Sequence, residues 1–297
     1  MLNVLNSVAD VWIGRRAVPR GEALAAVSGR APAVVVTGAS RGIGRALAAR
    51  FAADGQAVLL IAREMPALEE AASAISRDAG VRAVPLALDV TLPDAPARID
   101  AALAAADLYA DVLVNNAGMG LAGPFVDQPW EGIEQLIALN MTAASRLMRH
   151  VLPSMLGRAR GGILNVGSLG GLVPGPHQAA YYASKAYLIS LTEAVAFETR
   201  GRGVRIAVAA PGPVDTGFHH AMRAEYALYR SALPALSADA VARSAYRGFK
   251  IGRRVIVPGL VPQAAQLAVK LLPHAITVPI VGALLGVTLR NGADEKG

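Results

Sequence analysis

Short apolar runs alternate with longer Ala- and Leu-rich segments from residue 33 onward. The runs "AVVVTG" and "AVLLIAR" are separated by "RGIGRALAARFAADG", and "PALEEAASAISRDAG" follows the second of them. Runs that are apolar at consecutive positions predict strands buried on both faces, as in a parallel sheet covered by helices. Strands that alternate with helical segments of this length predict βαβ units.

Five further runs have the same strand character. They are "VRAVPLALDV", "ADVLVNNAG", "GGILNVGS", "GVRIAVAAPGPV" and "RRVIVPG", and no linker interrupts them. We therefore expect an α/β fold with a single doubly wound, Rossmann-type parallel sheet and helices on both faces. The predicted division is an N-terminal extension (1–32), a dinucleotide-binding and catalytic domain (33–257) and an apolar C-terminal extension (258–297).

Composition narrows the classes of function. The 297 residues are 54% hydrophobic, enough for a large core, and contain no cysteine, which excludes disulfides and thiolate sites and fits a reducing, cytoplasmic setting. The net charge of +7 suits anionic small molecules or an anionic membrane at least as well as nucleic acid, for which no reading motif is visible. The N-terminus lacks the features of a secretory signal.

Ligands of doubly wound sheets bind beyond the carboxyl ends of the strands. The first such turn is "TGASRGIG", in which Gly38, Gly42 and Gly44 separate a strand from a helix. These glycines would let a pyrophosphate approach the backbone at a helix N-terminus. The alternative is a plain structural turn.

The second strand ends at Arg63, where a site selective for NAD(H) would be expected to carry an acidic residue. An arginine suits a 2′-phosphate, and Arg41 in the glycine turn could add a second positive charge. NADP(H) is therefore preferred over NAD(H), the alternative being two solvated arginines.

The third and fourth strands end in polar residues. Asp89 could accept from an adenine amine or could simply start a turn. "NNAG", residues 115–118, could let the backbone pass close to a ring or could satisfy its own backbone.

The stretch "AAYYASKAYL" places Tyr181 and Tyr182 upstream of Lys185. On a helix, position i+4 is rotated by about 40° and position i+3 by about 60°, so geometry favours Tyr181 only slightly. An ammonium beside a phenol favours the phenolate and eases proton exchange. The alternative is an aromatic pair that packs on a helix face.

Five motifs, in this order, resemble those of the short-chain dehydrogenase/reductase family: "TGASRGIG", "NNAG", "NVGS" with Ser168, "YYASK" and "PGPVDT". The resemblance covers residues 33 to about 257. It implies that Ser168 holds the substrate carbonyl oxygen, Tyr181 passes the proton, and Lys185 lowers the phenol pKa and grips the nicotinamide ribose. It also implies that Asn140, which interrupts a helix, holds a water in a proton relay.

By the same resemblance, Asn116 contacts the cofactor, and Val214 and Thr216 contact the nicotinamide carboxamide. The full set of expected cofactor contacts is Gly38, Ser40, Arg41, Gly42, Ile43, Gly44, Arg63, Asp89, Val90, Asn116, Ala117, Gly118, Tyr181, Lys185, Pro211, Gly212, Val214 and Thr216. No metal is expected, because the five histidines show no spacing of a catalytic metal site. Residues 217–236 stand where the family keeps its variable substrate lid.

The function predicted is hydride transfer between NADP(H) and a carbonyl or alcohol substrate in a protein that forms a homo-oligomer. Two alternatives remain open: a catalytically silent cofactor-binding sensor, and a membrane-surface scaffold. The sequence does not single out a substrate.

The C-terminal stretch "LLPHAITVPIVGALLGVTLRNG" has no Asp, Glu, Lys or Arg between Lys270 and Arg290. Its length is close to the roughly 20 residues that span a bilayer, but Pro273 and Pro279 interrupt it. We expect packing on the body or a dimer partner first, peripheral membrane contact second and a true span third.

Overall fold

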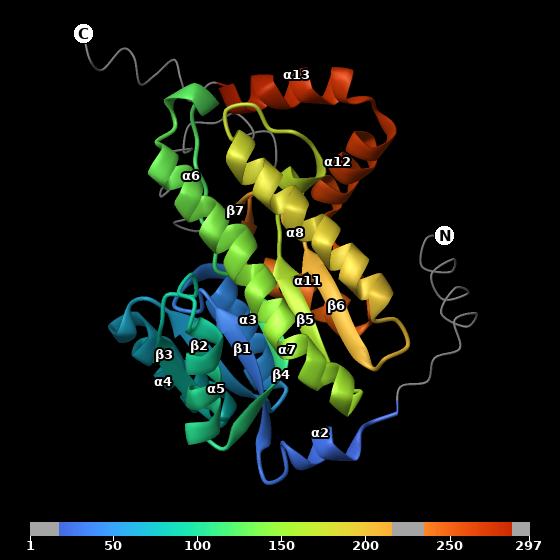
Figure 1. The fold of residues 1–297 in the computed structure, drawn as a ribbon. Coiled ribbons are helices and arrows are strands. Elements are labelled where there is room, and N and C mark those ends of the chain that lie inside the picture. Colours follow the sequence, from blue (N-terminus) through green and yellow to red (C-terminus); the bar gives the residue numbers. More distant parts are fainter. Residues whose placement is uncertain (1–17, 216–234, 287–297) are drawn as a thin grey trace.

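Seven parallel strands form one sheet in the computed structural model, which describes residues 18–215 and 235–286 (Figure 1). The strand order is β3-β2-β1-β4-β5-β6-β9. The strands are β1 (Ala31–Thr37), β2 (Ala57–Ala62), β3 (Ala83–Ala87), β4 (Leu108–Asn115), β5 (Gly161–Val166), β6 (Val204–Ala209) and β9 (Val255–Ile256). Each overlaps one of the apolar runs, with β1 and β4 beginning two residues before theirs, and the predicted doubly wound sheet is confirmed.

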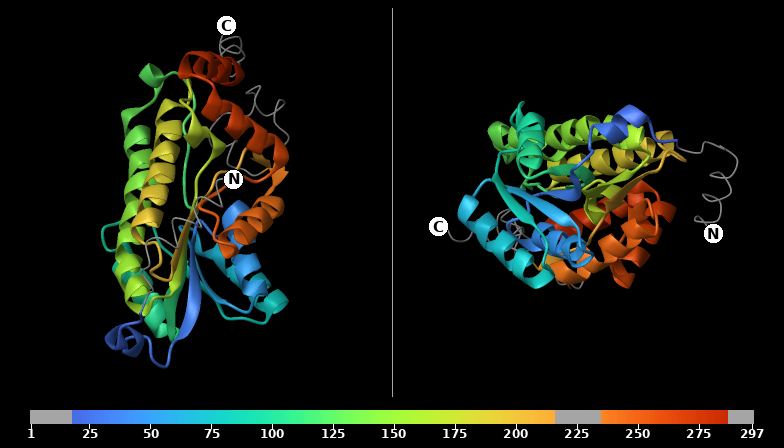
Figure 2. Two further views of the ribbon diagram at one scale, coloured as in Figure 1. Left: turned by 90° about the vertical axis from the view of Figure 1, so that its right-hand side faces the viewer. Right: turned by 90° about the horizontal axis from the view of Figure 1, so that it is seen from below.

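Helices cover both faces of the sheet, as the turned views in Figure 2 show. One face carries α3 (Gly42–Ala53), α4 (Met65–Ala79) and α11 (Ala238–Lys250), and their buried side chains share a core with Val34 and Val36. The other face carries α5 (Ala95–Ala105), α7 (Ala144–Arg158) and α8 (Ala179–Glu198), which share a core with Ala33 and Val35. Neighbouring residues of β1 therefore face opposite cores, which explains its consecutive apolar residues.

Shorter elements complete the described chain. They are α2 (Gly21–Ala25), the 3-10 helices η1 (Phe125–Asp127) and η3 (Leu169–Leu172), α6 (Trp130–Ile137), the π-helix η2 (Ala138–Ala143), and a separate strand pair β7 (Val214–Asp215) and β8 (Leu236–Ser237).

Strands β1, β2 and β3 are added toward one edge of the sheet, and after β3 the chain crosses back to add β4 on the other side of β1. Strand β1 pairs with β2 on one side and with β4 on the other, so that Val34 lies beside both Val58 and Val112. The turns that follow β1 and β4 consequently lie next to each other at the carboxyl edge, where a doubly wound fold binds its ligand.

The C-terminal extension forms two helices, α12 (Leu260–Leu271) and α13 (His274–Leu285). The 12 residues of α13 begin directly after Pro273, and Pro279 lies inside the helix. Within residues 18–215 and 235–286, no helix is both long and apolar enough to cross a membrane. Helix α13 contacts the loop before α8, since a Cβ at Gly282 would lie 3.2 Å from Pro176 and one at Gly286 would lie 3.4 Å from His177. Most of its side chains nevertheless remain at least partly exposed.

Candidate functional site

The glycine turn after β1 is built for close backbone approach. Gly38 and Gly42 have φ angles of +64° and +58°, a region that L side chains rarely adopt. A Cβ at Gly44 would lie 2.2 Å from the carbonyl oxygen of Gly38. Ser40 and Ile43 belong to the same turn, and α3 begins there with its unpaired N–H groups.

Thr37, the last residue of β1, ties this turn to the one after β4. Its Oγ1 accepts hydrogen bonds from the backbone N–H groups of Asn116 and Ala117, both at 3.0 Å. The Asn116 side chain in turn donates to the carbonyl oxygens of Thr37 and Gly38, both at 3.0 Å. The sequence reasoning missed Thr37, whose partners lie about 80 residues further along the chain.

Two exposed arginines and one carboxylate lie around this turn. The side chains of Arg41 and Arg63 form no hydrogen bond or salt bridge within the described part of the chain. Asp89 Oδ1 accepts from the hydroxyl and the N–H of Thr91, at 2.7 and 2.9 Å, and these bonds, with the charge of Arg63, lower the pKa of Asp89. Asp89 thus starts a turn, which is one of the two roles that the sequence predicted for it. Val90 beside it is buried.

Asn140 lies within the π-helix η2, as an asparagine that interrupts a helix should. Its Nδ2 donates to the carbonyl of Met119 at 2.8 Å and to Ser184 Oγ at 3.0 Å, and its Oδ1 accepts from the N–H of Met119 at 2.9 Å. Ser184 Oγ donates to the carbonyl of Tyr181 at 2.7 Å. Asn140 therefore links the loop after β4 to α8, through a serine that the sequence reasoning did not identify.

Tyr181 and Ser168 meet where β5 ends and α8 begins. Ser168 precedes η3, and its Oγ accepts from the N–H of Gly170 at 3.1 Å. Burial raises the pKa of Tyr181 to about 12, and the hydrogen bond with Ser168 offsets part of the rise. The resemblance implied a phenol pKa lowered by Lys185, whereas here burial outweighs the hydrogen bond with Ser168 and the pKa lies above its ordinary value of 10.

Lys185 is 5% exposed and donates through Nζ to the carbonyl of Val166 at 3.1 Å. Burial lowers the pKa of Lys185 to about 8, and Nζ lies 5.8 Å from the centre of the Tyr181 ring. A Cβ at Gly118 would lie 3.3 Å from both Lys185 Nζ and Asn140 Oδ1. The glycine of "NNAG" thus lies against the side chains of Asn140 and Lys185.

Tyr182 occupies a different environment from Tyr181. Its ring packs so closely on two glycines of the loop before α8 that a Cβ would lie 2.9 Å from the ring at Gly170 and 2.3 Å from it at Gly175. Tyr182 therefore supports this loop, whereas Tyr181 hydrogen-bonds with Ser168.

The predicted nicotinamide loop lies beside Ser168. The carbonyl of Pro211 accepts from the N–H of Leu169 at 2.8 Å, Val214 is buried, and Gly212 lies under Pro262 of α12. Thr216 and nearly all of the predicted lid, residues 217–236, lie outside the described residues.

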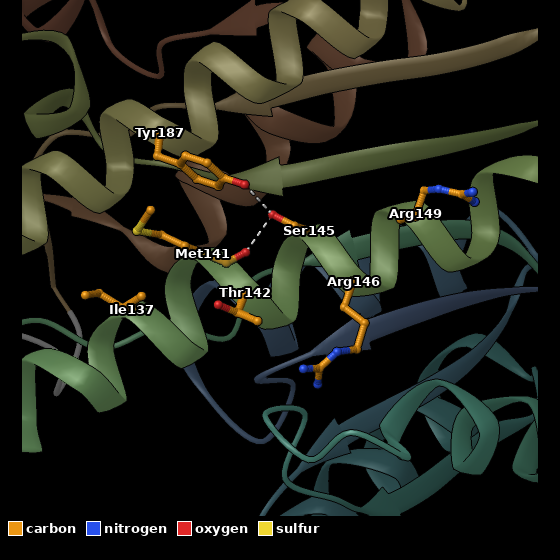
Figure 3. A pocket seen from close by; sticks show the side chains of 7 residues that line it. All are labelled: Ile137, Met141, Thr142, Ser145, Arg146, Arg149 and Tyr187. Carbon is orange, nitrogen blue, oxygen red and sulfur yellow. Dashed lines mark hydrogen bonds between the residues drawn. The ribbon is translucent and has the colours of Figure 1, made fainter.

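A pocket of about 430 Å³ lies elsewhere, on the outer side of η2, α7 and α8 (Figure 3). Its lining is Ile137, Met141, Thr142, Ser145, Arg146, Arg149 and Tyr187. Ser145 Oγ donates to the carbonyl of Met141 at 2.7 Å and lies 2.9 Å from the Tyr187 hydroxyl. Because Tyr187 is rotated by about 200° from Lys185 on the helix, this pocket opens away from the candidate site.

No cluster of three or more His, Asp or Glu side chains suited to a metal ion occurs among the described residues.

Comparison with known proteins assigns the chain to a family. The model described as "short chain dehydrogenase" matches residues 32–227. A very-long-chain 3-oxoacyl-CoA reductase of Laccaria bicolor is 36% identical over 174 residues, which are 58% of this chain and 52% of that protein. Eight curated relatives match this chain over between 52% and 75% of their own length.

Solved structures agree with this assignment. A short-chain dehydrogenase from Sphingobium yanoikuyae in complex with NADPH is 32% identical, with a TM-score of 0.70 over 82% of this chain and 97% of that one. A short-chain dehydrogenase/reductase from Burkholderia phymatum in complex with NAD is 28% identical, with a TM-score of 0.71 over 83% of this chain and 94% of that one. With its seven-stranded sheet, its glycine turn and a match that covers well over half of its residues, the chain belongs to the short-chain dehydrogenase family.

Proposed function

We propose that the protein is an NADP(H)-dependent oxidoreductase that transfers hydride between the nicotinamide and a carbonyl or secondary alcohol. The observation that carries the proposal is the buried Tyr181 hydrogen-bonded with Ser168, with Lys185 one helical turn away. Hydrogen-bond donors that converge at the carboxyl edge of a doubly wound sheet suit the polarisation of a carbonyl oxygen.

Tyr181 supplies the proton in the direction of reduction. Its phenol has a pKa of about 12 and is therefore protonated at neutral pH. It can donate this proton to an oxygen that gains negative charge. Ser168, fixed through its bond to Gly170, donates to the same oxygen once the carbonyl replaces Tyr181 as its partner. Oxidation of an alcohol follows the same path backwards, with Tyr181 as the base.

The described residues fit a nicotinamide dinucleotide, which would supply the hydride. Gly38 and Gly44 let the turn pack tightly on itself and on Asn116, where a Cβ would clash, and α3 would present its first N–H groups to a pyrophosphate. Pro211, Gly212 and Val214 would border the nicotinamide, and Lys185 would contact its ribose beside Gly118. Arg41 and Arg63, whose side chains have no hydrogen-bond partner in the described chain, favour the phosphate of NADP(H) over NAD(H).

The surroundings of Tyr181 favour an apolar carbonyl substrate. Its ring packs in a cluster with Leu136, and partly buried Met119 and Leu121 line the same cluster. The similarity to a protein named as a 3-oxoacyl-CoA reductase agrees with a ketone carried on an aliphatic chain. A panel of ketones, aldehydes and alcohols with both NADPH and NADH would identify the substrate.

Substitution of the two neighbouring tyrosines tests the proposal. Tyr181→Phe removes the proton donor and should lower turnover by about 10²- to 10⁴-fold, while NADPH binding is retained. Tyr182→Phe keeps the packed ring and should retain most of the activity. A fully active Tyr181→Phe protein, or equal losses in both variants, would contradict the assignment. A silent cofactor-binding sensor would bind NADPH and turn over no member of the panel.

We further propose a cytoplasmic homo-oligomer with the division 1–32, 33–257 and 258–297. The outer side of α7 and α8 exposes Tyr187 in a pocket with Arg146 and Arg149, and aromatic residues and arginine are enriched at protein interfaces. Light scattering of the wild type and of Tyr187→Ser would test the pairing, since loss of the contact should lower the mass.

A further inference from the structure

Helix α12 turns an apolar stripe toward solvent. Leu260, Leu267 and Leu271 are 83%, 60% and 74% exposed, and their spacing of seven and four residues places them on one helix face. Gln263, at the edge of the same face, is itself exposed and donates through Nε2 to the carbonyl of Val257 at 2.9 Å. A surface helix of a soluble protein normally turns its apolar face toward the core and its polar face toward solvent.

Helix α13 follows α12 along the chain and also exposes apolar side chains. Ile276 and Ile280, one turn apart, are about half exposed, whereas only Thr277 and Leu285 are buried in this helix. Figure 1 shows α13 lying across one end of the molecule, beyond the start of α8. We call Leu260, Leu267, Leu271, Ile276 and Ile280 the apolar stripe.

The charge of the surrounding sequence points to one kind of occupant. Neither α12 nor α13 contains an Asp or Glu, and in the sequence Lys270 and Arg290 flank the charge-free run. Basic residues beside aliphatic ones suit a surface that is apolar inside and anionic outside. Neither α12 nor α13 contains Phe, Tyr, Trp, Met or Arg, the residues that are enriched at protein–protein interfaces.

From these observations we propose that α12 and α13 dock the protein on the surface of a lipid bilayer that contains anionic headgroups. At 12 residues, α13 is about 18 Å long, too short for a hydrocarbon core of about 30 Å, so the helix lies within the interface. Docking would bring the loop at Pro176 and His177, which α13 contacts, close to the bilayer. This inference does not depend on the proposed reaction.

Vesicle co-sedimentation of the full chain tests the docking. Wild-type protein should sediment with phosphatidylcholine vesicles that contain phosphatidylglycerol, and less with phosphatidylcholine alone. Ile276→Ser combined with Ile280→Ser should weaken partitioning by about tenfold or more, because each isoleucine loses buried apolar area. The matched control is Val18→Ser combined with Ile251→Ser, which replaces two exposed aliphatic residues outside the stripe and should bind as the wild type does.

Thermal melts of all three proteins should coincide, since the substituted side chains are exposed. Wild-type protein that stays in the supernatant with both vesicle types would overturn the proposal, as would an equal loss in the control. Equal binding to both lipid compositions would overturn the role of the anionic headgroups. A mass by light scattering that falls only in the Ile276 and Ile280 variant would show that a second copy covers the stripe.

Discussion

Burial favours the uncharged form of both central side chains, Tyr181 and Lys185. Tyr181 has its pKa raised to about 12 and Lys185 has its pKa lowered to about 8. Both shifts disfavour ionisation, and the lysine carries a cost that folding must offset. Shifted pKa values of this kind are common at functional sites.

Lys185→Met should therefore stabilise the fold at neutral pH while it impairs activity. A Lys185 pKa of about 8 against an ordinary 10.5 corresponds to about 3 kcal/mol of destabilisation below pH 8. The variant also loses the hydrogen bond to Val166, which costs about 1 kcal/mol. Its free energy of unfolding at pH 7 should therefore be about 2 kcal/mol higher than that of the wild type.

The sign of the pH dependence distinguishes this cause from simple repacking. Between about pH 8 and 10.5 the unfolded state binds more protons than the folded state, so wild-type stability rises with pH over this window. Urea unfolding should show the advantage of Lys185→Met shrinking from pH 7 to pH 10. An advantage that is constant with pH would refute the explanation.

Arg63→Ala tests cofactor selection. A charge-assisted hydrogen bond contributes about 1.5 to 3 kcal/mol, so NADPH affinity should fall by about tenfold to a hundredfold while NADH affinity changes little. Titration of both cofactors by fluorescence is sufficient, with Arg98→Ala on the exposed side of α5 as the control. A wild type that prefers NADH would defeat the assignment.

The choice between Tyr181 and Tyr182 shows how far sequence reasoning reaches at the scale of residues. Helical geometry favoured Tyr181 only slightly, and the structure separates the two by their surroundings: Ser168 for one, Gly170 and Gly175 for the other. Thr37 and Ser184 were missed because their importance lies in backbone groups distant in sequence, which spacing along the chain does not reveal.

At the scale of elements, the contact between η3 and α8 positions Ser168. A Cβ at Gly171 would lie 2.7 Å from the backbone of Lys185 and from the Ile189 side chain. Gly171→Ala should push η3 away from α8 and lower kcat by about tenfold or more, since small misplacements of catalytic groups are costly. NADPH affinity should change much less.

The matched control is Gly132→Ala in α6. A Cβ there would meet nothing closer than 3.4 Å, and alanine is favoured over glycine in a helix by about 0.5–1 kcal/mol. This variant should be fully active and melt at a slightly higher temperature. Equal activities of the two variants would contradict the role given to η3.

Strands were readable from the sequence because a buried parallel strand must be apolar on both sides. The exact form of the helix around Asn140 was not readable, since a π-helix is selected by the bonds of Asn140 to Met119 and Ser184. Of the two prolines expected to interrupt the C-terminal run, Pro273 separates α12 from α13, whereas Pro279 lies inside α13.

At the scale of the whole molecule, α3 and α11 join the beginning and the end of the sheet through ion pairs. Asp54 accepts from the Tyr246 hydroxyl and from Lys250 Nζ, the latter at 2.9 Å, and both bonds lower the pKa of Asp54. A second set links Arg50 to Asp239 at 2.6 Å. These contacts connect segments almost 200 residues apart, which local patterns do not predict.

Asp54→Asn should lower the free energy of unfolding by only about 0.5 kcal/mol, because the carboxylate is nearly half exposed and well screened. A lowered carboxyl pKa contributes stability above its ordinary value of 3.8 and loses it as the pH falls through the lowered value. Denaturant melts at pH 7 and pH 3 should show the difference shrinking with acidity. A difference that persists in concentrated salt would contradict the electrostatic origin.

The position of β1 in the middle of the sheet also governs how a nascent chain can fold. Residues 31–37 leave the ribosome early, yet one edge of β1 waits for residues 108–115 of β4 before its backbone N–H and C=O groups are paired. Until then the nascent protein exposes an apolar strand edge that other chains can join. Synthesis of this protein should therefore depend on chaperones over this interval, and a pause in translation before β4 should increase aggregation.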